Sequence, residues 1–252
     1  MDRAIYTAMG AASAALTQQS VAANNLANAA TTGFRAQLAA FRAAPVNGPT
    51  LATRTLVVPS VPGNDFSPGP INISGNNLDV ALDQHGWLAV RLPDGGEAYT
   101  RNGRIEIDSA GGLRVQNYLL LGADSQPLTV LPGAAVTFGP DGTLSVLGDG
   151  DEPKTLVQIG QLKLVRLEPD SLRHDDSGLF NLTDTARAQR GAVLPADPTL
   201  RLTPGAFEGS NVSPVQTMVE MIGNARSFEM QMKVISNVND NARAGNQLLA
   251  IG

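Results

Sequence analysis

Few side chains of this sequence could perform acid–base or metal chemistry. It has two histidines, His85 and His174, and no cysteine. Neither histidine has the HExxH spacing that places two zinc-binding imidazoles on one helix face. Asp175 and Asp176 follow His174 directly, and the three could form a small metal or acid–base cluster. The Ser-Gly pair that comes next favours a solvated turn instead, so we expect no metal site here.

Other catalytic patterns are also missing from the sequence. The glycines at 95, 96, 103, 111 and 112 lack the lysine and the strand-to-helix context of a phosphate-binding loop, and they favour hairpin turns. No GxSxG nucleophile motif accompanies a candidate base. Without cysteine there is no disulfide framework, thiol nucleophile or cysteine-ligated zinc. We therefore expect no cofactor and no catalytic residue, and predict that the protein is not an enzyme.

The composition sets limits on the class of protein. The net charge is −5, which gives no basic surface for nucleic acid or an anionic membrane. Hydrophobic residues make up 42% of the chain, enough for a core, while 26 glycines and 16 prolines favour short strands and turns. No apolar span reaches the roughly 18 residues of a transmembrane helix. The N-terminal residues lack the hydrophobic run of a cleavable signal peptide, so we expect a cytosolic chain or export without one.

The two ends of the chain have the spacing of helices that pair. Small and apolar residues recur there with alternating spacings of three and four, which is typical of a coiled coil. The N-terminal stripe consists of Ile5, Met9, Ala12, Leu16, Gln19, Ala23 and Leu26. The C-terminal stripe consists of Met218, Met221, Ala225, Phe228, Met232, Ile235, Asn239, Ala242, Asn246 and Leu249. Ser213-Pro214-Val215-Gln216 precedes it with the residue order of a capping box. We predict terminal helices within residues 1–35 and 213–252.

Between these ends the hydrophobic period changes to two. Leucine and valine alternate over residues 78–82 and 88–92, and the second run leads into the turn residues Asp94-Gly95-Gly96. Asn102-Gly103 has the form of a two-residue hairpin turn, and Gly111-Gly112 and Asp141-Gly142 separate further short strands. This pattern predicts a central, mainly antiparallel β domain over residues 76–185.

Two extended arms are expected to join the β domain to the helices. Residues 36–75 and 186–212 are rich in proline and glycine and contain scattered β-formers such as Thr55 to Val58. The predicted fold class is therefore α+β: paired terminal helices of coiled-coil type, and a central β domain joined to them by extended, β-rich arms.

Three asparagines, Asn24, Asn25 and Asn28, lie in the alanine-rich N-terminal helix although asparagine lowers helix propensity. They could be packed amides that bond neighbouring backbone, or they could mark the end of the helix before Gly33. Both terminal helices have few large apolar residues and little charge around their circumference. Burying a leucine returns about 1.5–3 kcal/mol while ordering each residue costs about 1–2 kcal/mol, so an isolated pair is marginal. We expect neighbouring molecules on several sides.

Three groups of motifs resemble those of bacterial flagellar rod and hook proteins. The N-terminal signature is ANNLANAATTGFR, and its C-terminal counterpart is EGSNVSPVQTMVEMIGNARSFEMQMKVI. The middle of the chain contributes LDVAL, AYTRNGRIEID and GGLRV. The resemblance covers nearly the whole chain. The opening MDRAIYTAMGAASAAL, the segment FRAQLAAFRAAPV and the chain length are most similar to the proximal-rod members of the family, with the distal-rod members as the alternative.

This resemblance implies a structural subunit that packs through its terminal helices into a helical, torque-transmitting tube. Heterologous contacts that do not close a ring produce such open assemblies, and segments too poor in core to fold alone order on assembly. The implied location is the basal body, in the rod that spans the periplasm. The implied partners are proximal-rod subunits below, the distal-rod protein above, copies of the chain, and the type III export apparatus. Nucleic acid and direct membrane insertion are not implied.

Twelve residues of the two terminal signatures are the candidates for the assembly interface, although each could serve the fold of the subunit instead. They are Leu16, Asn25, Leu26, Asn28, Gly33, Phe34, Asn211, Met218, Ile222, Arg226, Phe228 and Ile235. The competing hypothesis is a β-domain enzyme or binding protein with incidental helical tails. It requires a concave site with convergent polar groups, and no such site can be identified in the sequence.

Overall fold

The computed structural model describes residues 2–45, 55–60, 63–131, 134–147, 156–175 and 177–249. Contacts divide the chain into two compact units. The helical unit contains residues 1–29, 36–65 and 212–252, and the β unit contains residues 30–35 and 66–211. Helices at the ends and antiparallel strands in the middle confirm the α+β class.

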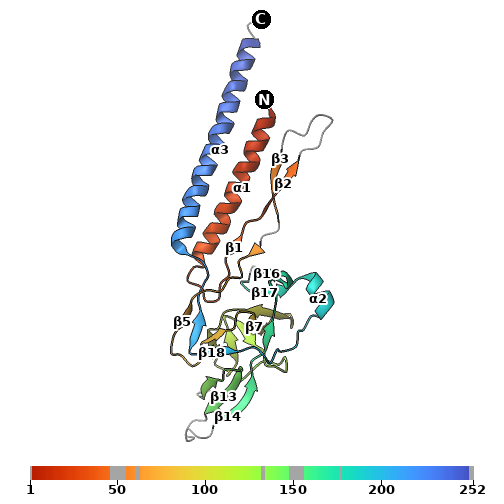
Figure 1. Ribbon diagram of the computed structural model, residues 1–252, viewed down its shortest axis with the longest axis vertical. Coiled ribbons are helices and arrows are strands. Elements are labelled where there is room, and N and C mark those ends of the chain that lie inside the picture. Colours follow the sequence, from red (N-terminus) through yellow and green to blue (C-terminus); the bar gives the residue numbers. More distant parts are fainter. Residues whose placement is uncertain are drawn as a thin grey trace. The chain divides into compact units, whose positions relative to one another are not determined.

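The helical unit is built on two long helices that lie side by side in Figure 1. Strand β3 packs against α1 and pairs with β2 as an antiparallel hairpin, and β1 pairs with β4. The bounds are α1 (Asp2–Ala27), α3 (Pro214–Leu249), β1 (Gln37–Leu38), β2 (Phe41–Pro45), β3 (Thr55–Pro59) and β4 (Gly63–Asn64).

The buried stripe of α1 differs from the predicted one at every second position. Ala8, Ala15 and Ala22 are buried together with Ala12, whereas Met9 and Leu16 are 53% and 54% exposed. The neighbours of α1 in this unit are α3, β3 and β1. Alanine allows helix backbones to approach closely, while the larger side chains one position further on point away from the packed face. The prediction that Met9, Leu16 and Ala23 lie on the packed stripe was therefore wrong.

The same one-residue displacement occurs in α3. Thr217 is buried while Met218 is 50% exposed, and Met232 is exposed while Gln231 is partly buried. The positions predicted correctly recur every seven residues. They are Met221, Phe228, Ile235 and Ala242, all partly buried. The packed face of α1 thus consists of small residues, whereas that of α3 also contains Met221, Phe228 and Ile235. Each helix has a second face with apolar residues that this unit leaves exposed.

The helix α3 begins at Pro214, where the sequence predicts it. The backbone N–H of Thr217 donates to the carbonyl of Ser213, which closes the first turn. The Gln216 side chain donates forward to Glu220 at 3.3 Å, so it does not form the reciprocal bond of the predicted capping box.

The β unit is organised around an antiparallel sheet of eight strands. The strand order is β16-β17-β8-β7-β11-β10-β9, and β15 also pairs with β7. Central strand β7 is buried on both faces, since Leu88 and Val90 belong to one hydrophobic core and Trp87 and Ala89 to the other. The bounds are β7 (Gly86–Arg91), β8 (Glu97–Thr100), β9 (Ile105–Ile107), β10 (Leu113–Val115), β11 (Tyr118–Leu120), β15 (Leu164–Arg166), β16 (Leu172–His174) and β17 (Phe180–Leu182).

Smaller sheets and short helices complete the β unit. One sheet has the order β12-β13-β14, β6 pairs with β18, and β5 pairs with β19, all antiparallel. The bounds are β5 (Ile71–Ile73), β6 (Val80–Leu82), β12 (Ala135–Phe138), β13 (Thr143–Leu147), β14 (Val157–Gln161), η1 (Pro169–Ser171), α2 (Asp184–Arg190), β18 (Leu202–Pro204) and β19 (Ala206–Glu208).

Three of the four predicted turns join paired strands. The glycine-containing turns at 94–96, 111–112 and 141–142 connect β7 to β8, β9 to β10 and β12 to β13. The predicted hairpin at Asn102-Gly103 is wrong, because β8 pairs with β7 and β17 while β9 pairs with β10. A Cβ added to Gly103 would lie 1.7 Å from the carbonyl oxygen of Val80. This glycine therefore serves the close approach of two backbone segments.

The two predicted arms are divided between the units. Residues 36–65 group with the terminal helices, whereas residues 66–75 and 186–211 group with the central β region. The reason is strand pairing, because the first predicted arm supplies β5 and the second supplies β18 and β19. Residues 46–54 and 61–62 of the first arm lie outside the described residues.

Candidate functional site

His174 lies at the end of β16, and its surroundings support the predicted turn. Its ring packs edge to face on Phe180, 5.0 Å between centroids. The backbone N–H of Gly178 donates to the carbonyl of Asp175, and Gly178 has the positive φ of +82° that a turn glycine adopts. Asp176 lies outside the described residues. Over the described part of the chain, no three His, Asp or Glu side chains gather as a metal site would require.

Three strongly buried charges of the β unit meet at Glu208. Its side chain is 3% exposed and forms ion pairs with Arg35 and Arg101, which are 2% and 1% exposed. Oxygen Oε1 accepts from Arg35 Nη1 at 2.8 Å and from the backbone N–H of Gly69 at 2.9 Å. Oxygen Oε2 accepts from Arg101 Nε at 2.9 Å and also from Nη2. We call Arg35, Arg101 and Glu208 the Glu208 clamp.

Arg101 extends the Glu208 clamp to the loop after β6. Its guanidinium donates to the carbonyl of Asp83 at 2.6 Å and of Leu82 at 3.3 Å, and also to that of Gly86. It also lies over the Trp87 ring, 5.8 Å from the centroid. A planar guanidinium with five donors suits this role, because it can bind a carboxylate by two nitrogens and still cap several carbonyls.

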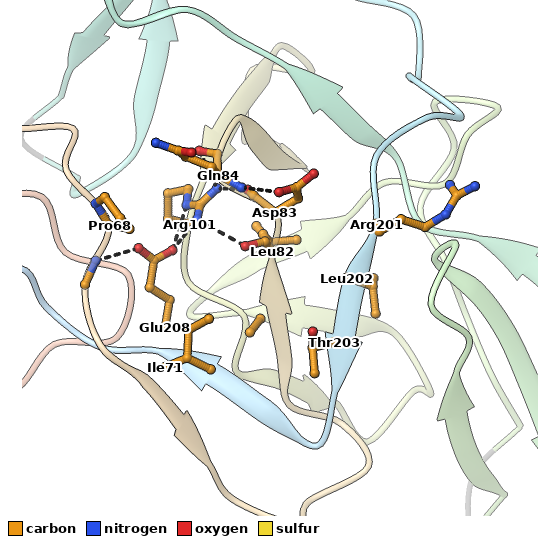
Figure 2. A pocket seen from close by; sticks show the side chains of 12 residues that line it. Pro68, Ile71, Leu82, Asp83, Gln84, Arg101, Arg201, Leu202, Thr203 and Glu208 are labelled. Atoms are coloured by element: carbon orange, nitrogen blue, oxygen red, sulfur yellow. Dashed lines mark hydrogen bonds and ion pairs between the residues drawn. The ribbon is translucent and has the colours of Figure 1, made fainter.

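Figure 2 shows the Arg101–Glu208 pair in the wall of a pocket of about 320 Å³. Ile71, Gln84, Arg201 and Thr203 lie around the same space. Both functional groups of the pair are engaged with each other and with backbone, so they offer no free hydrogen-bonding capacity to a small molecule. The arrangement is that of an internal support for the fold.

Backbone bonds join the same segments around the Glu208 clamp. The N–H of Gly33 donates to the Glu208 carbonyl at 2.8 Å, and that of Asn211 donates to the Phe34 carbonyl at 3.3 Å. Gly33 has φ +69°, and a Cβ there would lie 2.4 Å from the carbonyl carbon of Arg101. Position 33 thus requires glycine both for its backbone conformation and for the space available.

A second buried ion pair lies elsewhere in the β unit. Lys163 Nζ pairs with Glu97 Oε1 and donates to Ser125 Oγ at 2.8 Å. The Tyr99 hydroxyl donates to Glu97 Oε2 at 3.3 Å. Burial, and then the negative charge of Glu97, raise the pKa of Tyr99 well above its ordinary value. The tyrosine therefore stays protonated, as a hydrogen-bond donor requires.

The structure explains the asparagines of α1 in two ways. Asn25 Nδ2 donates to the carbonyl of Gln37 at 2.9 Å, and Asn25 Oδ1 accepts from the N–H of the same residue at 2.8 Å. It is a packed amide that holds the start of β1 against the end of α1. Asn28 Nδ2 donates to the Asn24 carbonyl at 3.0 Å, so Asn28 supports the end of the helix. Both sequence interpretations therefore hold, for different residues.

The exposed apolar side chains of the two long helices form the second candidate surface. Charged or polar residues are the usual occupants of exposed helix positions, and apolar groups gathered in this way indicate contact with another molecule. Those on α1 are Tyr6, Met9 and Leu16, and those on α3 are Val215, Met218, Val219, Ile222, Met230, Met232 and Val234.

The twelve predicted interface residues occupy four kinds of position. Exposed on the helices are Leu16, Met218, Ile222 and Arg226. Partly buried on them are Leu26, Phe228 and Ile235. Residues that hydrogen-bond within their own unit are Asn25, Asn28 and Asn211, which donates to the Ser67 carbonyl at 3.1 Å. Buried in the β unit are Gly33 and Phe34. Their part in contacts between subunits stays a prediction.

The residues of the Glu208 clamp were not singled out from the sequence. Each lies within a recognised motif: Arg35 ends TTGFR, Arg101 ends AYTR and Glu208 begins EGSN. The available signal was a charged residue close to a glycine, since Glu208 precedes Gly209 directly and Arg35 and Arg101 each lie two residues from a glycine. What could not be read was the partnership, because Glu208 is separated from Arg101 by 107 positions.

Comparison with known proteins identifies the class to which this architecture belongs. Residues 5–35 match the family described as flagella basal body rod protein, and residues 203–248 match flagellar basal body rod FlgEFG protein C-terminal. The chain is 54% identical to the flagellar basal-body rod protein FlgF of Salmonella typhimurium and 53% identical to that of Escherichia coli, each over 251 residues and 100% of both chains. It is 30% identical to the rod protein FlgG of Borreliella burgdorferi, over 98% of this chain and 99% of that protein.

The chain therefore belongs to the flagellar basal-body rod protein family. Within that family it is more similar to these two FlgF proteins than to this FlgG protein. It is a structural subunit of the basal-body rod, and, like these relatives, it is not an enzyme. No helix in the described ranges has the length and apolar character needed to cross a membrane.

Proposed function

We propose that the chain is a FlgF-like subunit of the proximal rod that assembles through α1 and α3 into a helical tube and transmits torque. The observation that carries this proposal is the second apolar face of each long helix, which the helical unit leaves exposed. Burial of apolar area is the dominant driving force of association, and helices with such faces gain most from neighbours on several sides. In this proposal α1 and α3 pair in the manner of a coiled coil, and neighbouring subunits cover the outer faces.

The proposed partners are copies of the chain, the other proximal-rod subunits below it and the distal-rod protein FlgG above it. Export is proposed to occur through the flagellar type III apparatus without a cleaved signal, to a rod that spans the periplasm. The proposed division of the chain has five parts: terminal helices at 1–35 and 213–252, connecting arms at 36–75 and 186–212, and a central β domain at 76–185. The twelve interface residues are part of the same proposal.

The first prediction tests the helix surface with a matched pair of substitutions. Leu16→Glu introduces a carboxylate at a position of α1 where the native side chain is 54% exposed. Val193→Glu introduces one at a position of the β unit where the native side chain is 56% exposed. Both variants should leave the unfolding midpoint of the purified chain within a few degrees of wild type, because exposed substitutions cost little. In a strain that lacks the native gene, L16E should be absent from isolated basal bodies and should not restore swimming, whereas V193E should do both.

Incorporation of L16E at the level of V193E would contradict assembly through α1. A corresponding pair on α3, Ile222→Glu with the same V193E control, tests the other helix, since Ile222 is 55% exposed. Removing residues 1–29 and 214–252, which spares residues 30–35 of the β unit, tests the enzyme alternative. The proposal predicts a folded chain that no longer enters the rod, whereas retained binding or turnover of a small ligand would favour the alternative.

A further inference from the structure

The Glu208 clamp lies where the chain passes between its two units. Residues 30–35 enter the β unit directly after α1, and residues 207–211 leave it directly before α3. The chain passes between the units at four points, 29–30, 35–36, 65–66 and 211–212, and these two segments carry three of them. We call each such segment a connection. Arg35 belongs to the first connection and Glu208 to the second, and their side chains meet at 2.8 Å inside the β unit.

A third segment, residues 66–70, closes the arrangement. It enters the β unit from the helical unit at position 66. The Ser67 carbonyl accepts from Arg35, and the N–H of Gly69 donates to Glu208. The N–H of Gly209 donates to the Pro70 carbonyl at 2.8 Å, and a Cβ on Gly69 would lie 2.2 Å from the Gly209 carbonyl oxygen. All three connections are thus held by one carboxylate and by backbone packed too closely for side chains.

We infer that the Glu208 clamp makes the three connections open and close as one cooperative piece with the β unit. A buried carboxylate that loses its charge leaves both guanidiniums without their counter-ion, which is far more costly than the loss of an exposed ion pair. Neighbouring backbone bonds between the same segments should then open with it. Glu208 is therefore a positioning residue: through it, a force on either terminal helix reaches the β unit at the same place.

The mechanical part of this inference rests on the proposed function, whereas the cooperative part can be measured on the free chain. Glu208→Gln keeps the shape of the side chain and removes its charge. Glu97→Gln is the matched control, because Glu97 is 4% exposed and pairs with a lysine that is 1% exposed, away from the connections. Amide hydrogen exchange of the purified full chain is the measurement.

In E208Q the amides of Gly33, Gly69, Gly209 and Asn211 should exchange together, at least about tenfold faster than in wild type, while those of β10 and β11 keep their rates. In E97Q these four amides should keep their rates. Three outcomes would overturn the inference. They are faster exchange at the amides of only one connection, no change in the exchange rates, and an equal increase for the four amides in both variants. If E208Q does not fold, Arg35→Gln should accelerate the same four amides, since it removes the ion pair between Arg35 and Glu208 while it leaves the Arg101–Glu208 pair in place.

A second measurement addresses the load. Cells with E208Q rods should swim as wild type in dilute medium and lose flagella in viscous medium, whereas cells with E97Q rods should keep them. E208Q rods that survive viscous load as well as wild type would refute the mechanical part. Failure of the wild-type chain itself to enter rods would instead refute the proposed function, and would leave the exchange result standing.

Discussion

Single residues at the Glu208 clamp lie in closely constrained environments. The Glu208 carboxylate accepts four hydrogen bonds from three residues, which is the condition under which a buried charge is tolerated. Gly33 beside it combines a positive φ with backbone contact on the Cβ side. The signature TTGFR is thus explained in part by the fold of the subunit itself, before any contact between subunits is considered.

A series of three alanine substitutions separates the two requirements at Gly33. Gly33→Ala should lower the free energy of unfolding by on the order of 2–3 kcal/mol, because it adds both a strained φ and a clash. Gly75 has nearly the same φ, +70°, but open space around its Cβ, so Gly75→Ala should cost only about 1 kcal/mol. Gly223 lies in α3 with open space, and Gly223→Ala should stabilise that helix by about 0.5–1 kcal/mol. Denaturant unfolding measures all three, and equal effects at Gly33 and Gly75 would show that the close contact does not matter.

At the scale of elements, α1 packs through a face of small residues. The stripe of Ala8, Ala12, Ala15 and Ala22 is buried while larger apolar residues remain exposed. Alanine packing brings the helix backbones close together but buries little apolar area, so the pair of helices is held weakly. The larger apolar residues stay available for other molecules.

Gln19 lies on the packed stripe of α1 and provides a test of that weakness. In the described part of the chain, its side-chain oxygen is buried without a hydrogen-bond partner. Gln19→Leu should therefore stabilise the helical unit by about 1–2 kcal/mol, since it removes an unsatisfied polar group and adds apolar burial. Helix content measured by circular dichroism during thermal unfolding should persist to higher temperature. An unchanged or lower midpoint would show that the amide is satisfied in solution.

At the scale of the whole molecule, surface carboxylates link stability to pH. Hydrogen bonds from Thr199 and then from Arg166 lower the pKa of Asp197 to about 2. The Arg114 side chain lowers the pKa of Asp108, and Thr143 lowers that of Asp141. Because each folded pKa lies below the unfolded value, the ionised groups stabilise the fold above about pH 4. This stabilisation is lost as the pH falls from about 4 toward 2.

The resulting prediction concerns the β unit in acid. Trp87, the single tryptophan, is buried there, so its fluorescence reports unfolding of this unit. The thermal midpoint should be nearly constant from pH 8 to 5 and should fall steeply below pH 4. Asp197→Asn should lower the midpoint at pH 7 and reduce the drop in acid, because it removes one of the titrating groups. A variant that loses as much stability between pH 4 and 2 as wild type would contradict the role of Asp197.

Much of this protein could be predicted from sequence, because the relevant physics is local. The terminal helices, the start of α3 at Pro214 and the turns at 94–96, 111–112 and 141–142 follow from hydrophobic period, capping and glycine. The motifs also indicated the family. These features depend on residues within a few positions of each other, where propensity and spacing act.

Only the tertiary structure decided which helix face is packed, which strands on either side of Asn102-Gly103 pair, and which residues bind Glu208. A heptad pattern with apolar residues on two faces does not predict which face meets the partner helix. In α1 the alanine face is packed, because alanine allows the backbones to approach closely. An Asn-Gly pair between two strands predicts a hairpin only if those two strands pair with each other. Here β8 pairs with β7 and β17, and β9 pairs with β10. The three charges of the Glu208 clamp lie in three motifs far apart along the chain. They meet only because the fold brings these distant segments together, and a local sequence pattern cannot predict that.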